Sequence, residues 1–225
     1  MFRMISTLLL TCLMVTSVFA EMVHIPADRD ATLIEDAGGG AANGLGPLFA
    51  GHTNQQLFGV RRALVRFDVA SALPENAIID RVFLSLYQNS SNTEPSSVSL
   101  HRVLGDWGEG ASFSNGGSGA AAEPGDATWM HTFYDYDYWV QQGGRFVAVA
   151  SATEVVGGKD FYTWQSTVHM VNNVRHWLHD QSRNFGWLIM GDEDTRGSVK
   201  RFDSRESGDS DQQPMLTIEY HLPGK

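Results

Sequence analysis

The chain has 225 residues, and its 16 basic and 26 acidic side chains give a formal net charge of −10 at pH 7. Nucleic acids and anionic lipid surfaces bind concentrated Lys and Arg, so this acidic balance argues against both as partners. A chain of this length can bury a sizeable core, and all-β domains commonly reach about 200 residues.

Residues 1–20 have the pattern of a secretory signal peptide, and we expect cleavage near Ala20. Arg3 precedes the apolar run 8–15, and small residues surround the cleavage position. The run is too short to span a bilayer. A lipoprotein anchor at Cys12 is the alternative, but apolar residues continue past the cysteine, which disfavours an anchor. The pattern therefore predicts a secreted protein, either extracellular or periplasmic.

The remaining residues, 21–225, are predicted to form a single domain. Cleavage takes Arg3 from the 16 basic residues, which leaves 15 against 26 acidic residues and a net charge of −11. It also removes the only cysteine, so burial of apolar side chains must hold the fold without a disulfide. No later apolar run is long enough to cross a membrane.

Apolar and polar side chains alternate in several short segments, which is the pattern of half-buried strands. In residues 62–70 the inward side chains are Ala63, Val65, Phe67 and Val69. In residues 78–87 they are Ile78, Val82, Leu84 and Leu86. Further strands are expected at 98–104, 145–150, 185–190 and 215–220.

One segment, residues 166–181, has helical periodicity, with apolar residues three or four apart. Ser166 or Thr167 can cap its start, and residues 184–186 can end it. Two segments rich in Gly, Ala and Ser, 36–46 and 108–126, are expected to be surface loops. Many short strands with one short helix predict an all-β fold, a jelly-roll-like β-sandwich.

Calcium is the one cofactor for which the sequence offers candidate ligands. Asp192, Glu193 and Asp194 crowd one loop, and calcium takes several oxygen ligands from such loops. Their spacing does not match an EF-hand, so a solvated turn is the alternative. His176 and His179 share a helix face, but no third ligand follows at a defined spacing, and we expect surface histidines.

Catalysis has one local candidate, Asp106 and Glu109, which flank Trp107. Two carboxylates can act as acid and base on a glycosidic bond, and they can equally hold the backbone amides of a loop. The chain has no Gly-x-Ser-x-Gly motif for a serine nucleophile. A noncatalytic protein is therefore the prediction, with a small polysaccharide lyase or glycosidase as an alternative.

Aromatic side chains indicate a sugar-binding surface. Tyr134, Tyr136 and Tyr138 alternate with aspartates and would share one face of a strand. Flat rings stack on the C–H faces of sugars, and carboxylates accept hydrogen bonds from hydroxyls. Trp107 is a further candidate for stacking. The alternative is that these rings simply cover the sheet.

Residues 200–207, with the sequence KRFDSRES, read as a charged strand. Arg201, Asp203 and Arg205 would face one way and form an ion network. Such a network can hold the sandwich edge together as a latch. If it is exposed, Arg201 and Arg205 can instead bind an acidic glycan.

Six segments, taken in order, resemble the DNRLRE-domain proteins, a group similar to carbohydrate-binding module family 96. These segments are 61–87, 98–110, 126–133, 170–178, 184–193 and 200–220. The resemblance implies a noncatalytic, jelly-roll-like module of a secreted bacterial protein with a glycan ligand, for which acidic algal polysaccharide is the known precedent. The negative charge suits a polyanion poorly, unless a basic patch of Arg196, Lys200, Arg201 and Arg205 acts locally.

These observations together predict a secreted, noncatalytic carbohydrate-binding module whose partner is a polysaccharide or a surface glycan. The candidate ligand-binding residues are Trp107, Tyr134, Tyr136, Tyr138, Arg201 and Arg205. The main alternative is a structural or adhesive protein of the cell surface that binds no sugar and associates through an exposed sheet edge.

Overall fold

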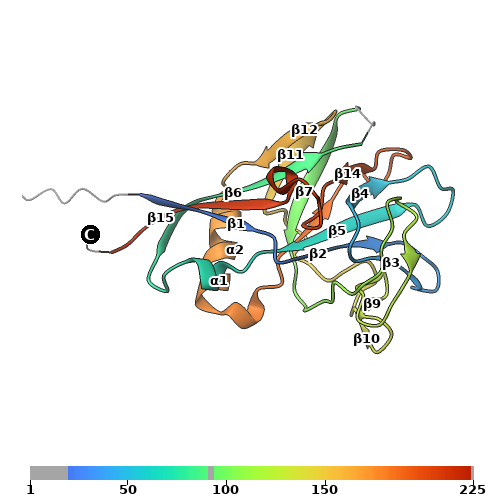
Figure 1. Ribbon diagram of the computed structural model, residues 1–225, viewed down its shortest axis with the longest axis horizontal. Coiled ribbons are helices and arrows are strands. Elements are labelled where there is room, and N and C mark those ends of the chain that lie inside the picture. The colour runs from blue at the N-terminus through green and yellow to red at the C-terminus, as the bar shows by residue number, and fades with distance from the viewer. Residues whose placement is uncertain (1–19, 91–93, 224–225) are drawn as a thin grey trace, which may run out of the picture.

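The computed structural model describes residues 20–90 and 94–223. The predicted signal peptide therefore lies outside the described residues, except for Ala20. Strands dominate the described chain, and each of their pairings is antiparallel. The prediction of an all-β sandwich is confirmed (Figure 1).

The first layer is built around the longest strand, β6 (Ile78–Gln88). This strand pairs with β15 (Met215–His221) and with β12 (Asp160–Trp164). β1 (Glu21–Pro26) adds to β15, so the first and last strands of the described chain lie side by side.

The second layer runs in the order β5 (Val60–Arg66), β13 (Trp187–Met190), β7 (Ser96–Arg102) and β11 (Ala152–Val156). β2 (Arg29–Ile34) pairs with β5, and β3 (Ala41–Asn43) and β8 (Ala120–Ala121) extend the sheet from β2. β4 (Leu48–His52) and β14 (Lys200–Phe202) pair with each other and connect the two layers. Hydrogen bonding is therefore continuous from β1 to β11.

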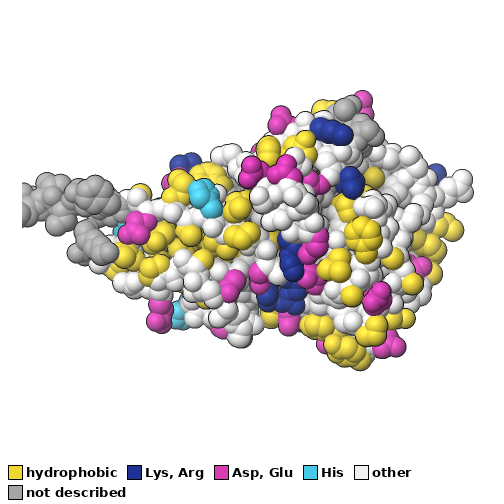
Figure 2. Space-filling model, in the orientation of Figure 1, with side chains coloured by type: hydrophobic (Ala, Val, Ile, Leu, Met, Phe, Trp, Pro, Cys, Tyr) yellow, Lys and Arg dark blue, Asp and Glu magenta, His cyan; other side chains and the backbone are white. Residues whose placement is uncertain are grey.

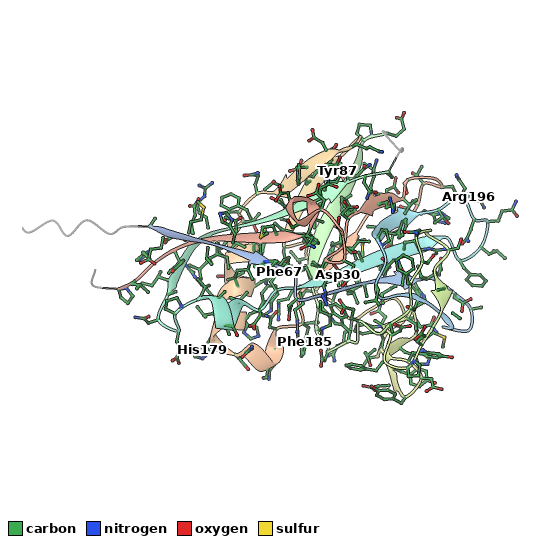
Figure 3. All side chains as sticks on the ribbon, viewed as in Figure 1. Asp30, Phe67, Tyr87, His179, Phe185 and Arg196 are labelled. Atoms are coloured by element: carbon green, nitrogen blue, oxygen red, sulfur yellow. The ribbon has the colours of Figure 1, made fainter. Side chains whose placement is uncertain are left out.

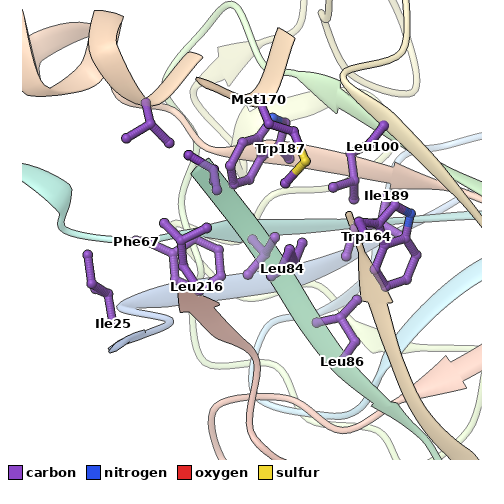
Figure 4. Close-up of a cluster of buried hydrophobic side chains, with 14 of the residues drawn as sticks. Ile25, Phe67, Leu84, Leu86, Leu100, Trp164, Met170, Trp187, Ile189 and Leu216 are labelled. Carbon is purple, nitrogen blue, oxygen red and sulfur yellow. The ribbon is translucent and has the colours of Figure 1, made fainter. Parts of the chain in front are cut away.

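A hydrophobic core lies between the layers (Figure 4). It takes Leu84 and Leu86 from β6 and Trp187 and Ile189 from β13. The four residues predicted to face inward from 62–70 all belong to it. At the start of β6 the prediction is wrong by one residue: Ile79 is buried and Ile78 is exposed. The pairing with β15 shifts register there, and such an irregularity changes which side chain points inward.

The predicted helix is α2 (Val168–His179), and Thr167 caps it by accepting a hydrogen bond from the amide of Met170 at 3.1 Å. α2 packs against β6, and Met170, Val174 and Trp177 join the core. The remaining helical elements are short: α1 (Val69–Ala72) and the 3-10 turns η1 (Gln181–Arg183) and η2 (Ser210–Gln212). No helix among the described residues has the length and apolar character needed to cross a bilayer.

A second, smaller core covers the outer face of the second layer. Its buried residues are Ala31, Leu33, Leu64, Val103, Trp107, Ala127, Trp139 and Leu188. The Gly-rich segments 36–46 and 108–126 are loops over most of their length, as predicted, but they also contribute the short strands β3 and β8, which pair with each other. Their backbones approach closely: a Cβ on Gly44 would lie 2.0 Å from the carbonyl oxygen of Glu109. Only glycine fits at that position.

Two other predicted strands are also wrong. Residues 145–150 form only one isolated bridge, between Phe146 and Val103, and the edge position beside β7 belongs to β11. The segment 133–139 does not run as one strand, because the chain reverses between β9 (His131–Phe133) and β10 (Asp137–Tyr138).

Candidate functional site

The β9–β10 hairpin carries the most exposed aromatic side chains of those predicted to bind sugar. Tyr136 and Tyr138 are 70% and 58% exposed. The ring of Tyr136 stacks nearly parallel to that of Phe133, with 5.9 Å between centroids and an interplanar angle of 16°. Figure 2 shows hydrophobic and acidic side chains beside each other at this corner of the molecule, at the lower right. We call Phe133, Tyr134, Tyr136 and Tyr138 the tyrosine hairpin surface.

The base of this hairpin is buried and hydrogen-bonded. Trp139 is buried, and its Nε1 donates to the carbonyl of Thr128 at 3.0 Å. The buried ring of His131 is hydrogen-bonded to the Thr128 hydroxyl at 2.9 Å. The rings of Tyr134 and Tyr138 pack on His131, with centroids 5.0 and 4.3 Å away. The exposed rings therefore stand on a fixed support, and less entropy is lost when a ligand binds them.

The two aspartates of the hairpin turn, Asp135 and Asp137, are exposed beside the rings. A carboxylate only accepts hydrogen bonds, so these groups suit sugar hydroxyls and repel anionic ligands. The sequence placed the three tyrosines on one strand face. The structure instead distributes them around a turn, where Tyr134 is half-buried and Tyr136 and Tyr138 face solvent.

Trp107 is not available to a ligand, contrary to the prediction. It is fully buried in the second core, its Nε1 donates to the carbonyl of Phe185 at 2.9 Å, and the guanidinium of Arg29 lies over its ring. Five of the six tryptophans are buried, and Trp129 is the one with partial exposure. Any aromatic stacking surface in the described chain therefore consists mainly of tyrosine and phenylalanine.

The acidic loop proposed for calcium does not bring its carboxylates together. Asp192 Oδ1 accepts hydrogen bonds from the amides of Asp194 and Thr195, both at 3.0 Å. The side-chain hydrogen bond with Thr195, followed by these amide bonds, lowers the pKa of Asp192. Glu193 forms a two-pronged ion pair with Arg62, at 2.7 and 2.9 Å. These contacts explain the acidic residues as turn and ion-pair partners.

The predicted network of Arg201, Asp203 and Arg205 is divided in two. Arg201 donates to the side chain of Asn89 at 2.8 Å, and the amide of Asn89 donates to Asp203. Arg205 contacts different acidic groups, because β14 ends at Phe202 and the following residues turn. The expected basic patch of Arg196, Lys200, Arg201 and Arg205 is not formed as a surface, because Lys200 is fully buried. Its Nζ donates a hydrogen bond to the carbonyl of Glu94 at 2.5 Å.

The partners of Arg205 form a cluster that the sequence did not predict. Asp30, Glu109 and Glu206 each offer a carboxylate oxygen, and these oxygens lie within 4.8 Å of one another. Arg205 Nε is 3.0 Å from Glu109 and 3.1 Å from Glu206. Its backbone amide donates to Asp30 at 2.8 Å. The three acids are far apart in sequence, so spacing could not reveal them. We call them the acidic cluster.

Burial raises the pKa of each carboxyl in the acidic cluster, most strongly that of Asp30, which is fully buried. The amide of Arg205 and its guanidinium act in the opposite direction on Asp30. Asp106, the other candidate acid or base, is paired with Arg29 at 3.1 Å and accepts from the Trp107 amide at 2.9 Å. Asp106 and Glu109 thus both have structural partners.

The fold and these surfaces define an all-β sandwich with an exposed aromatic hairpin and a partly buried acidic cluster. No protein-family model matches the chain, and no curated protein matches its sequence. The resemblance to DNRLRE-domain proteins therefore stays a prediction.

Proposed function

We propose that this protein is a noncatalytic carbohydrate-binding module and that the tyrosine hairpin surface holds the glycan. The observation that supports the proposal most is the exposure of Tyr136 and Tyr138 on a hairpin with a buried, hydrogen-bonded base. Neighbouring exposed apolar side chains often mark a binding surface, and sugars offer apolar faces that aromatic rings cover.

The charge of the surface favours a neutral glycan over an acidic one. Asp135 and Asp137 flank the rings, and the basic patch that was expected to attract a polyanion loses Lys200 to the interior. Like charges at an interface oppose binding, whereas neutral sugars offer hydroxyls to the carboxylates. The ligand proposed here therefore differs in charge from the acidic algal polysaccharide implied by the resemblance.

Binding by a single shallow surface is expected to be weak, with a dissociation constant of about 1 μM to 1 mM. The test is binding of the chain after cleavage near Ala20 to insoluble cellulose and chitin, and affinity electrophoresis in alginate and sulfated galactan. Retention on a neutral polymer, with little retardation by the anionic ones, supports the proposal. Binding to none of the four, together with self-association in light scattering, favours the structural or adhesive alternative.

A further inference from the structure

The acidic cluster lies where three distant segments meet. Asp30 belongs to β2, Glu109 follows β7, and Glu206 follows β14. Figure 3 labels Asp30 near the middle of the molecule, and the corresponding region of Figure 2 shows acidic and basic side chains together. Hydrogen bonds already join the segments: Glu109 Oε1 accepts from the backbone amide of Asp30 at 2.8 Å.

The charges within the acidic cluster do not balance. With all three carboxylates in the ionised form that binds a cation, they carry −3, and Arg205 supplies +1, which leaves −2. Arg29, whose charge also acts on Glu109, is already paired with Asp106 at 3.1 Å. Burial strengthens the repulsion among like charges because little water screens them. A divalent cation would neutralise the remainder.

Asp30 provides an independent indication of a ligand. The residue is fully buried, and its Oδ1 has no hydrogen-bond partner among the described residues. Its Oδ2 accepts a hydrogen bond from the amide of Arg205, which holds the carboxylate in the cluster while Oδ1 accepts no hydrogen bond. Buried polar atoms in native proteins nearly always have a partner, so this oxygen requires a proton or a bound group.

One member of the acidic cluster, Glu206, borders a surface pocket. The pocket has a volume of ≈ 260 Å³ and is also lined by Arg201, Asp203 and Ser204. The side chain of Glu206 is 26% exposed, that of Glu109 is 16% exposed, and Asp30 is fully buried, so Glu206 is the most accessible member of the cluster. The pocket therefore brings solvent to one ligand of the acidic cluster.

We propose that Asp30, Glu109 and Glu206 bind a calcium ion that holds β2, the segment after β7 and the turn after β14 together. All three ligands are carboxylates, which are the ligands of hard cations, and neither His nor Cys joins the group. Calcium tolerates irregular coordination and accepts water and carbonyl oxygens at its remaining positions, whereas magnesium demands a regular octahedron. The affinity expected is that of extracellular modules, about 10⁻⁴–10⁻³ M.

The experiment compares thermal unfolding in chelator, in millimolar calcium and in millimolar magnesium, with calorimetric titration of calcium into the chelated protein. The first test variant is Glu206→Gln, which removes a carboxylate but keeps the size of a partly exposed side chain. The second test variant is Asp30→Asn. Asp194→Asn is the matched control, because it removes an acid from the loop that sequence favoured for calcium.

The expected result is a saturable rise in melting temperature with calcium, smaller with magnesium. Glu206→Gln and Asp30→Asn should lose this rise, and Asp194→Asn should retain it. If Asp30→Asn does not fold, Glu206→Gln alone decides. Equal melting temperatures in chelator and in calcium, with no heat of binding, would overturn the proposal. A proton on Asp30 would then account for its unpaired oxygen. A calcium response that survives Glu206→Gln would overturn it as well.

Discussion

The backbone amide of Arg205 donates a hydrogen bond to Asp30 Oδ2, with 2.8 Å between the two atoms. The residues are 175 positions apart, so this bond ties the turn after β14 to the second strand of the chain. The side chain of Arg205 adds ion pairs with Glu109 and Glu206. The segment 200–207 is therefore held to the fold through β2 and through the start of the long excursion after β7.

We expect Arg205→Ala to lower the free energy of unfolding by about 1–3 kcal/mol. The substitution leaves Glu109 and Glu206 without their charged donor in a partly buried place, and an unpaired buried group costs about that much. Urea denaturation measures the change. The control is Arg183→Ala, which removes an exposed ion pair with Asp180 and should leave the free energy of unfolding almost unchanged. Equal effects of the two variants would contradict the assigned role.

Stability without divalent cations should fall as the pH rises from acid to neutral. The carboxyls of Asp30, Glu109 and Glu206 have folded-state pKa values above the ordinary 3.8 or 4.5. A group whose pKa is higher in the folded state than in the unfolded state stabilises the fold fully at pH values below its unfolded-state pKa. This contribution is lost as the pH rises through its folded-state pKa.

Urea denaturation in chelator at a series of pH values above about 4 tests this dependence. Glu206→Gln should flatten it, because one titrating carboxyl is removed. If calcium binds the acidic cluster, millimolar calcium should also flatten the curve by restoring stability at neutral pH. A wild-type stability that rises steadily between acid and neutral pH in chelator would contradict the raised pKa values.

Tyr136→Ala and Tyr138→Ala should each weaken glycan binding about 5- to 150-fold, the effect of losing about 1–3 kcal/mol of ring stacking. Both rings are exposed, so the melting temperature should hardly change. Phe161→Ala is the matched control, because it removes a 50% exposed ring on β12, away from the hairpin. Depletion from solution by the glycan measures the affinity. Loss of binding in the control alone would place the ligand on the outer face of β12.

Trp107→Ala should behave in the opposite way. It should destabilise the fold by about 3–5 kcal/mol, because a fully buried ring and its hydrogen bond to Phe185 are lost. At temperatures where the variant is folded, glycan affinity should stay near that of the wild type. The free energy from denaturation and the binding isotherm together separate a core residue from a ligand contact.

Gly44→Ala is expected to destabilise the fold by about 1–3 kcal/mol, since its Cβ would lie 2.0 Å from the Glu109 carbonyl oxygen. Gly208→Ala is the control, because a Cβ there meets nothing within 4 Å. The same clash displaces Glu109, so calcium should stabilise Gly44→Ala less than it stabilises the wild type. Thermal unfolding of both variants, with and without calcium, provides the comparison.

The elements with a strong local pattern could be predicted from the sequence. Alternation in 62–70 identified the inward face of β5, and helical spacing with Thr167 as cap identified α2. Short edge strands such as β3 and β8 have two or three residues, too few to show a period. The tight turn at 134–136 interrupts a run that alternates well enough to resemble a strand.

The candidate sites followed a similar division. The three tyrosines of the hairpin could be found from the sequence because they lie within five residues, but the sequence did not show that only Tyr136 and Tyr138 are exposed. Trp107 has the same chemistry in the sequence, and only the packing of residues 103–150 over the second layer decides that it is buried. The acidic cluster depends wholly on tertiary contacts among β2, Glu109 and Glu206, which no spacing along the chain encodes.

The pairing of β1 with β15 has a consequence for how the molecule would be displayed. Both ends of the described chain leave from the same end of the sandwich, and the β9–β10 hairpin lies at the opposite end (Figure 1). A tether joined to either end would point the tyrosine rings outward from its attachment point. Immobilising the protein through either terminus should therefore leave the proposed glycan surface open to a polymer.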